Sequence, residues 1–150
     1  MEIFEATSFD ITELSQLFND YHIFYKQPSD AAACRKFIAE RLQNRDSTIF
    51  VVRNETEIFG FAQLYPLFSS VQMKKLWLLN DLFVKQSSRR KGIARMLIER
   101  CRELAVETDA YGLLLETGKN NMEGNKLYPA EDFILLDNSN FYFWNTSLSE

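Results

Sequence analysis

The sequence predicts an α/β (α+β) fold in which a mixed, mostly antiparallel sheet of about seven strands is flanked by about four helices. Apolar residues recur at helical spacing in four segments, and seven short runs rich in Val, Ile, Leu and Phe are bounded by turn residues. These segments follow one another in the order βαα, three strands, αβα and two strands. Such an order is typical of a domain in which helices pack on a mixed sheet.

The first third of the chain predicts one strand and two helices. Residues 2–6 alternate weakly and indicate a strand. The following helix is predicted from five apolar residues at helical spacing, with Ser8 or Asp10 as its cap; these are Ile11, Leu14, Leu17, Phe18 and Tyr21. Residues 28–30, Pro-Ser-Asp, open a second helix that ends near Asn44.

The remainder predicts a hairpin, a crossover and a closing pair of strands. Residues 48–53 and 58–67 form the hairpin, and a long strand over residues 73–85 is interrupted by the polar pair Asn80-Asp81. A helix over residues 92–108, a strand over 111–117, a short helix over 122–130 and strands over 133–136 and 141–145 complete the chain. The unit from strand to helix to strand would place a ligand at the carboxyl ends of its strands.

The length, the composition and the net charge of the chain indicate how many domains it forms and which kinds of protein it is unlike. A chain of 150 residues with 46% hydrophobic content predicts a single domain spanning residues 1–150. A net charge of -4 disfavours a protein built to bind nucleic acid. No apolar run approaches the roughly 20 residues that span a bilayer, so we expect no membrane association and a cytoplasmic location. Cys34 and Cys101 lie among apolar neighbours, which favours reduced structural thiols, and no metal site is predicted.

The most informative stretch joins an apolar strand to an amphipathic helix through a basic turn. Residues 82–95 contain four cations, Arg89, Arg90, Lys91 and Arg95, around Gly92 at the predicted helix start. Unpaired amide groups and the positive end of the helix dipole favour an anion at such a position. The Walker and dinucleotide-binding glycine patterns are both absent, which disfavours the common nucleotide folds. The pattern predicts a local site for an anionic, nucleotide-like ligand.

This turn resembles the acetyl-CoA pyrophosphate loop, [QR]-x-x-G-x-[GA], of the GCN5-related N-acetyltransferase (GNAT) superfamily. Residues 89–94 match it, and residues 121–128 are similar to the family's N-x-x-A-x-x-L-Y helix, with Gly124 where Ala is usual. The resemblance implies a single-domain GNAT-like fold with acetyl-CoA as co-substrate. The residues that it implies for acetyl-CoA binding are Leu82, Phe83, Val84, Arg89, Arg90, Lys91, Gly92, Ile93, Ala94, Arg95, Asn121, Asn125 and Tyr128.

Three further stretches resemble particular groups within the superfamily. Residues 79–84 are similar to the strand before the loop in diamine and polyamine acetyltransferases, and residues 24–30 and 65–70 resemble elements of a microbial subgroup described as histone or polyamine acetyltransferase-like. Asn80 stands where the polyamine enzymes have a Glu that handles the substrate amine. Candidate residues for contact with the acceptor are Phe24, Tyr25, Tyr65, Phe68 and Asn80.

The chemistry requires a proton acceptor, because an alkyl amine has a pKa of about 10.4 and only its neutral form attacks a thioester. Asp81 is the first candidate and Glu116 the second, acting directly or through water; the structural alternatives are a carboxylate paired with a cation at a bulge and a solvent-facing carboxylate. The resemblance implies that the backbone amides of Phe83 and Val84 stabilise the oxyanion of a tetrahedral intermediate. It also implies that Tyr128 protonates the leaving thiolate.

We therefore expect an acetyl-CoA-dependent N-acetyltransferase that acts on a primary amine by direct attack, with a small polyamine-like acceptor favoured by the acidic protein. A protein lysine or N-terminal acetyltransferase is the alternative within the class. A non-catalytic acyl-CoA-binding regulatory domain is the alternative outside it. The aromatic run over residues 141–144 is compatible with core packing or with pairing to a second subunit in a homodimer.

Overall fold

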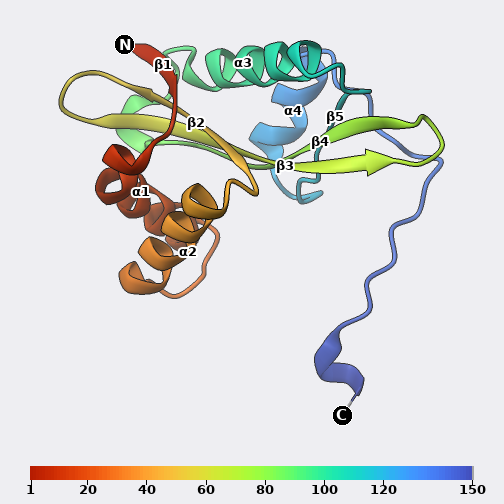
Figure 1. Ribbon diagram of the computed structural model, residues 1–150, viewed down its shortest axis with the longest axis horizontal. Coiled ribbons are helices and arrows are strands. Elements are labelled where there is room, and N and C mark those ends of the chain that lie inside the picture. The colour runs from red at the N-terminus through yellow and green to blue at the C-terminus, as the bar shows by residue number, and fades with distance from the viewer. Residues whose placement is uncertain (150) are drawn as a thin grey trace. The chain divides into compact units, whose positions relative to one another are not determined.

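The structure, a computed structural model, describes residues 1–149 and divides into two compact units, Met1–Glu116 and Thr117–Glu150 (Figure 1). The first unit contains the sheet and the helices α1 to α3. The second contains α4 and the C-terminal segment. The expected single domain over residues 1–150 stays a prediction.

The first unit is built on a five-stranded sheet whose order follows the sequence. Its strands are β1 (Glu2–Glu5), β2 (Thr48–Arg53), β3 (Ile58–Ser69), β4 (Lys74–Val84) and β5 (Leu113–Leu114). The first four pair antiparallel, and β5 pairs parallel to β4 only at Trp77 and Leu78. Beyond Leu78, the edge of β4 that faces β5 therefore has no strand partner among the described residues.

Helices cover both faces of this sheet. Helices α1 (Ile11–Phe24) and α2 (Ala31–Asn44) lie on one face, and α3 (Ile93–Glu107) lies on the other (Figure 1). The α1–α2 core includes Leu14, Phe18, Ile38, Val51, Phe61 and Phe83. The α3 core includes Phe50, Val52, Leu64, Trp77, Leu79, Leu97 and Cys101. The alternation of side chains along β2, Phe50 and Val52 against Val51, supplies both cores from one strand.

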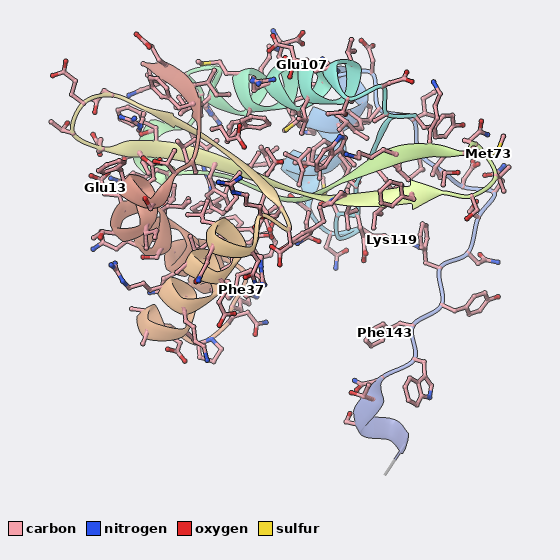
Figure 2. The ribbon with its side chains drawn as sticks, viewed as in Figure 1. Glu13, Phe37, Met73, Glu107, Lys119 and Phe143 are labelled. Atoms are coloured by element: carbon pink, nitrogen blue, oxygen red, sulfur yellow. The ribbon has the colours of Figure 1, made fainter. Side chains whose placement is uncertain are left out.

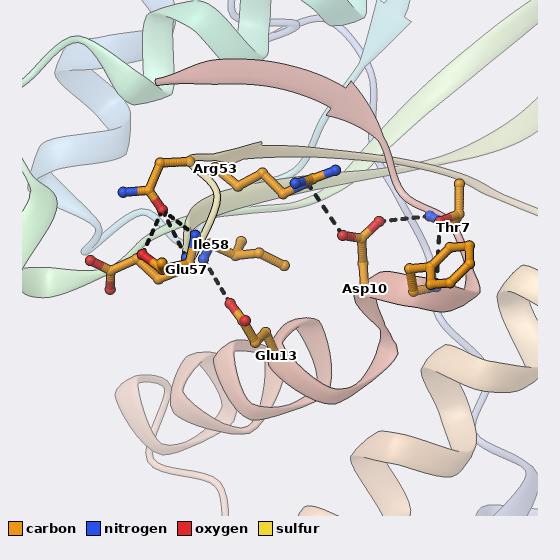
Figure 3. Close-up of polar contacts among 9 residues, drawn as sticks. Thr7, Asp10, Glu13, Arg53, Glu57 and Ile58 are labelled. Atoms are coloured by element: carbon orange, nitrogen blue, oxygen red, sulfur yellow. Dashed lines mark hydrogen bonds and ion pairs between the residues drawn. The ribbon is translucent and has the colours of Figure 1, made fainter.

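The beginning of α1 is fastened to the end of β2 and the start of β3 by polar contacts (Figure 3). Thr7 caps a 3-10 turn over Ser8–Asp10, and the Asp10 carboxylate accepts a hydrogen bond from the Thr7 amide at 2.9 Å. Asp10 also lies 3.4 Å from the Arg53 guanidinium, and Glu13 accepts a hydrogen bond from the Ile58 amide at 3.0 Å. The predicted caps are thus corrected: Asp10 makes no side-chain cap bond to α1, and Thr7 starts the helical segment.

The predicted sheet of about seven strands is corrected to five. Residues 133–136 and 141–145 form no strand in the described chain, and the expected strand over 111–117 is reduced to Leu113–Leu114. A strand exists only through its pairing, and these residues have no ladder partner among residues 1–149 apart from the short β4–β5 contact. The predicted class, a mixed and mostly antiparallel sheet with four α-helices, is confirmed.

The second unit begins with a turn and helix α4 (Met122–Ala130), followed by an extended chain and a 3-10 turn over Thr146–Ser149. Asn121 caps α4 by accepting a hydrogen bond from the Gly124 amide. Among the described residues no helix is long and apolar enough to cross a membrane.

Candidate functional site

The turn between β4 and α3 has the backbone geometry of an anion cradle. Arg90 and Gly92 both adopt left-handed conformations, with φ of 62° and 78°, on either side of Lys91. Within residues 1–149, the amides of Ile93 and Ala94 in the first turn of α3 donate to no backbone acceptor. Amides that converge in this way bind anions, and the helix dipole adds to the attraction.

Glycine is required at position 92 because of the backbone conformation there, and not because a larger side chain would clash with its neighbours. A Cβ atom built on Gly92 would meet no atom within 4 Å. Its φ lies in the region that residues other than glycine rarely adopt. The open space beside Gly92 leaves room for a phosphate to approach the backbone, so the residues present fit the pyrophosphate of acetyl-CoA.

The side chains of this turn are either exposed to solvent or held by contacts within the first unit. Arg90, Lys91 and Arg95 are exposed, whereas Ile93 is buried in the α3 core and offers a ligand only its backbone. The Arg89 guanidinium donates to the Val84 carbonyl at 3.2 Å and lies 4.8 Å from the centre of the Phe24 ring. Arg89 thereby attaches the end of α1 to the turn through a cation–π contact.

A β-bulge interrupts β4 four residues before the turn. Gln63 of β3 lies opposite Asp81, and Leu64 lies opposite Leu79, so Asn80 has no partner across the ladder. The extra residue changes the face to which the following side chains point. Trp77 and Leu79 belong to the α3 core, whereas Phe83 belongs to the α1–α2 core.

Asp81 is buried at this bulge, with 7% of its surface exposed, and it is held by two amide side chains. Its Oδ2 accepts hydrogen bonds from Gln63 Nε2 at 3.0 Å and from Asn80 Nδ2 at 3.1 Å. Its Oδ1 accepts none from any residue among 1–149, yet it is not sealed from solvent. The carboxylate thus has one oxygen fixed and one available to a ligand.

Sequence reasoning missed Gln63, which has no exposed surface. Its Oε1 accepts a hydrogen bond from the Ser47 hydroxyl at 3.0 Å, so both ends of the amide are satisfied. The signal in the sequence was a single Gln inside the otherwise apolar strand Ile58–Leu67. A buried polar residue with complete hydrogen bonding orients its neighbours.

The predicted acceptor residues are only partly brought together. Tyr65 is half-buried, and burial together with the Asp81 carboxylate raises the pKa of its phenol to about 12. Phe24 and Tyr25 are exposed at the end of α1, in contact with each other, and the Phe24 ring also contacts Phe83. Phe68 lies three positions after Tyr65 and therefore on the opposite face of β3.

The other candidate residues lie at the end of β5 and in the second unit. Glu116 is exposed two residues after β5. Asn121 Nδ2 donates to Thr117 Oγ1 at 2.8 Å, and Asn125 Nδ2 donates to the Gly118 carbonyl at 2.9 Å, so both amides fold the turn before α4. Tyr128 is half-buried, and its ring meets Phe133 edge to face.

Gly124, where the resembled motif has Ala, accommodates this turn. A Cβ atom there would lie 2.6 Å from Asn121 Nδ2 and 3.2 Å from Thr117 Oγ1. The absence of a side chain lets Asn121 pack directly on α4. Among residues 1–149 no three His, Cys, Asp or Glu side chains gather in a way that could hold a metal ion.

Comparisons with known proteins agree with this architecture. The family model described as Acetyltransferase (GNAT) family matches residues 11–133. The protein "Uncharacterized N-acetyltransferase YhfO" of Bacillus subtilis (strain 168) is 39% identical over 128 residues, which cover 85% of this chain and 86% of the relative. A "Probable acetyltransferase" of Haemophilus influenzae (strain ATCC 51907 / DSM 11121 / KW20 / Rd) is 30% identical over 137 residues, 87% of this chain and 94% of that one.

Solved structures extend the likeness to three dimensions. A crystal structure of a probable acetyltransferase superposes with a TM-score of 0.91 at 33% identity and covers 97% of both chains. An aminoglycoside acetyltransferase from a soil metagenome, solved with sisomicin, shares the fold with a TM-score of 0.82 at 17% identity. The sequence motifs, the sheet with its bulge and these matches lead to one conclusion: the chain belongs to the GNAT family of acetyltransferases.

Proposed function

We propose that this acetyltransferase moves the acetyl group of acetyl-CoA to the primary amine of a small, cationic, polyamine-like acceptor by direct attack. The observation that carries the proposal is the course of β4. One strand holds the half-satisfied carboxylate of Asp81 at its bulge and leads, three residues later, from Val84 into the left-handed turn with Gly92. A proton acceptor and an anion cradle therefore belong to one rigid element.

The turn binds the pyrophosphate of acetyl-CoA in this proposal. The amides from Gly92 to Ala94 donate to the phosphate oxygens, and Arg90, Lys91 and Arg95 contribute positive charge. Leu82 and Val84 contribute their backbone, because their N–H groups point away from β3 to the edge of β4 that has no strand partner beyond Leu78 among the described residues. The predicted amide of Phe83 points instead toward β3, as does that of Lys85, which donates to the Phe59 carbonyl. When bound, acetyl-CoA supplies an activated acyl group.

Asp81 acts as the base in this proposal. A protonated amine donates a hydrogen bond to Oδ1, while Oδ2 stays fixed by Gln63 and Asn80. Transfer of that proton to Asp81 leaves the neutral amine able to attack. Glu116, acting through water, is the alternative base. Glu116 is an exposed carboxylate two residues after the end of β5. Its side chain makes no hydrogen bond with any residue among 1–149.

In this proposal the acceptor binds among aromatic side chains on the α1–α2 face of β4. Phe24, Tyr25 and Tyr65 offer ring faces to a cation, and the pKa of Tyr65, raised to about 12, extends the pH range in which its phenol stays neutral. Asn80 is a further candidate contact, whereas the predicted contact from Phe68 is not part of this proposal because Phe68 lies on the opposite face of β3. A net charge of -4 attracts cationic acceptors over longer distances.

Tyr128 protonates the leaving thiolate in this proposal, with Asn121 and Asn125 shaping the turn that precedes its helix. The alternative acceptors, a protein lysine or N-terminus, would require the Phe24–Tyr25 side of the site to stay open to a peptide. A cytoplasmic location stays a prediction.

The proposal is tested by measuring thiol release from acetyl-CoA at fixed pH with spermidine, diamines, amino acids, aminoglycosides and a lysine-bearing peptide. Turnover with the di- and polyamines is the expected result. Turnover confined to the peptide would overturn the small-molecule acceptor in favour of a protein acceptor. Acetyl-CoA binding without turnover across the whole panel would overturn the proposed acceptor class.

A further inference from the structure

Arg89 lies at the point where the free edge of β4 meets the turn before α3. Its Nε donates to the Val84 carbonyl at 3.2 Å. The next amide, that of Lys85, donates to the Phe59 carbonyl on the β3 side, so the N–H and C=O groups of Val84 point to the opposite edge. Arg89 therefore binds a carbonyl on the same edge whose amides, in the proposed function, contribute to acetyl-CoA binding.

The guanidinium of Arg89 also contacts an aromatic ring that is assigned to the acceptor. Its Cζ atom lies 4.8 Å from the centre of the Phe24 ring at the end of α1 and 5.7 Å from the centre of the Phe83 ring on β4. The two rings contact each other, with centroids 5.7 Å apart. A guanidinium is planar, so it donates hydrogen bonds in its plane while its face stacks on a ring. One side chain thus touches both binding regions.

The residues assigned to acetyl-CoA lie on both sides of Arg89 along the chain. Val84 precedes it on the free edge of β4, and the amides of residues 92–94 follow it at the start of α3. Contacts to one ligand at both ends of a short segment restrict the conformations of the residues between them. Occupation of this region should therefore fix the Arg89 side chain, and with it the Phe24 ring.

The end of α1 depends on such a contact more than the middle of the helix does. Phe18, in the middle, is buried and stacks on Phe37 of α2, which is labelled in Figure 2, with ring centroids 5.7 Å apart. Phe24, at the end, exposes 51% of its surface. The packing between α1 and α2 therefore holds the middle of α1 and leaves its end to be held by contacts with β4 and the turn.

The backbone at the end of α1 is also unfavourable for its own sequence. The helix ends with Lys26 in a left-handed conformation, with φ of 60°. In this arrangement the amides of Lys26 and Gln27 donate to carbonyls in the last turn of α1. Glycine is the residue that adopts this conformation without cost, so a lysine here needs support from outside the helix.

We propose that Arg89 is a positioning residue for the acceptor site: it holds Phe24 and the end of α1 in place when the turn before α3 binds the pyrophosphate. The acceptor part of this inference rests on the proposed function, whereas the response of α1 to acetyl-CoA does not. Because binding free energies are linked, each ligand should raise the affinity for the other by the same factor. A cation–π contact at a partly exposed site corresponds to a factor of about 2–5.

The first test is hydrogen exchange at the end of α1, measured by NMR on the full chain with and without acetyl-CoA and with no amine present. In the wild type, the amides of residues 25–27 should exchange about 2–5 times more slowly when acetyl-CoA is bound. Arg89→Gln keeps an amide donor for the Val84 carbonyl but has no charge to place on Phe24, so it should bind acetyl-CoA and lose this response. An unresponsive wild type, a response that persists in Arg89→Gln, or a variant that no longer binds acetyl-CoA overturns the proposal.

Two further variants test whether the contact itself is responsible. Phe24→Leu removes the ring and leaves Arg89 in place, and it should lose the response as Arg89→Gln does. The matched control is Arg53→Lys, which removes a guanidinium that lies 4.4 Å from the centre of the Phe4 ring, outside the site, and should keep the wild-type response. A response kept in Phe24→Leu, or lost in Arg53→Lys, overturns the role of the Arg89–Phe24 contact.

The second test measures the steady-state kinetics of the same variants with spermidine as the amine. Arg89→Gln should raise KM for spermidine by about 2–5-fold and leave kcat nearly unchanged, because Arg89 positions the site without touching the reacting atoms. An unchanged KM would overturn the acceptor part of the inference. If spermidine is not a substrate, the proposed acceptor fails, and the hydrogen-exchange result still decides whether Arg89 holds the end of α1.

Discussion

Gln63 Nε2 donates a 3.0 Å hydrogen bond to Asp81 Oδ2 across strands β3 and β4, and this bond joins the only fully buried amide side chain of the sheet's described residues to the candidate base. Because Ser47 holds the other end of the amide, the carboxylate cannot rotate without breaking two hydrogen bonds. The orientation of the open Oδ1 atom is thus determined by the hydrogen bonds from Gln63 and Asn80 and by the contact of Gln63 with Ser47.

Replacing Gln63 by Leu should lower the free energy of unfolding by about 1–3 kcal/mol, because Ser47 and a buried carboxylate lose a partner. Urea denaturation followed by tryptophan fluorescence measures this change. Asn80→Ala is the control: it removes one hydrogen bond from an exposed side chain and should cost less than about 1 kcal/mol. Equal costs for the two variants would contradict the importance given to Gln63.

Replacing Asp81 by Asn should reduce kcat/KM by about 10²–10⁴, as expected for the loss of a general base. Acetyl-CoA affinity, measured by calorimetry, should stay unchanged, since the turn that binds the phosphates is intact. Asp109→Asn, at an exposed carboxylate paired with Lys74, is the matched control and should retain full activity. Retained activity in the Asp81 variant would transfer the role of base to Glu116 or to water.

Gly92→Ala should destabilise the protein by about 1–2 kcal/mol, because alanine pays for a left-handed conformation, and it should also weaken acetyl-CoA binding. Gly112→Ala is a sharp control: its Cβ atom would likewise meet nothing within 4 Å, but its φ is not in the left-handed region. Thermal unfolding and acetyl-CoA titration of both variants distinguish the effect of the left-handed backbone conformation from the effect of adding a methyl group. Similar behaviour of the two would show that the conformation of Gly92 is unimportant.

Tyr128→Phe should lower kcat with little effect on acetyl-CoA affinity, because the ring and its contact with Phe133 are kept while the phenolic proton is lost. Tyr111→Phe, at an exposed tyrosine of the first unit, is the matched control. Steady-state kinetics with the preferred amine distinguish the two. Wild-type kcat in the Tyr128 variant would remove it from the proposed mechanism.

Cys101 should make the protein less stable at alkaline pH. Burial raises the pKa of its thiol from 9.0 to about 12, so above pH 9 the unfolded chain loses a proton that the folded chain keeps. The stabilisation is therefore present below pH 9 and is lost as the pH rises toward 12, by up to roughly 1.4 kcal/mol per pH unit. Denaturation from pH 8 to pH 10.5 should show a shallower decline for Cys101→Ala than for the wild type. Parallel curves would contradict this assignment.

Local sequence determines much of this fold. The segments β2 and α3 lie within a residue or two of their predicted bounds, because alternation and helical spacing are properties of neighbouring residues. The glycine turn was predicted for the same reason, since the need for Gly92 and the start of α3 are local. The order of helices and strands in the first unit follows from these elements.

Pairing between distant segments was not predictable in the same way. The polar pair Asn80-Asp81 stood out in the sequence, but the bulge depends on how Gln63 and Leu64 align across the ladder. The strands expected over residues 133–136 and 141–145 were wrong for a related reason. Their residue types favour β-structure, whereas a strand also needs a partner that periodicity does not reveal.

The unpaired Asn80 makes the register of β4 as consequential as its composition. If Asn80 were instead paired across the ladder in regular alternation, Asp81 would point to the same side as Trp77 and Leu79, among the apolar residues beneath α3. Every amino acid of the strand would be unchanged, yet the carboxylate would lie on the wrong side of the sheet. The register of β3 against β4 therefore decides which side of the sheet the candidate base faces.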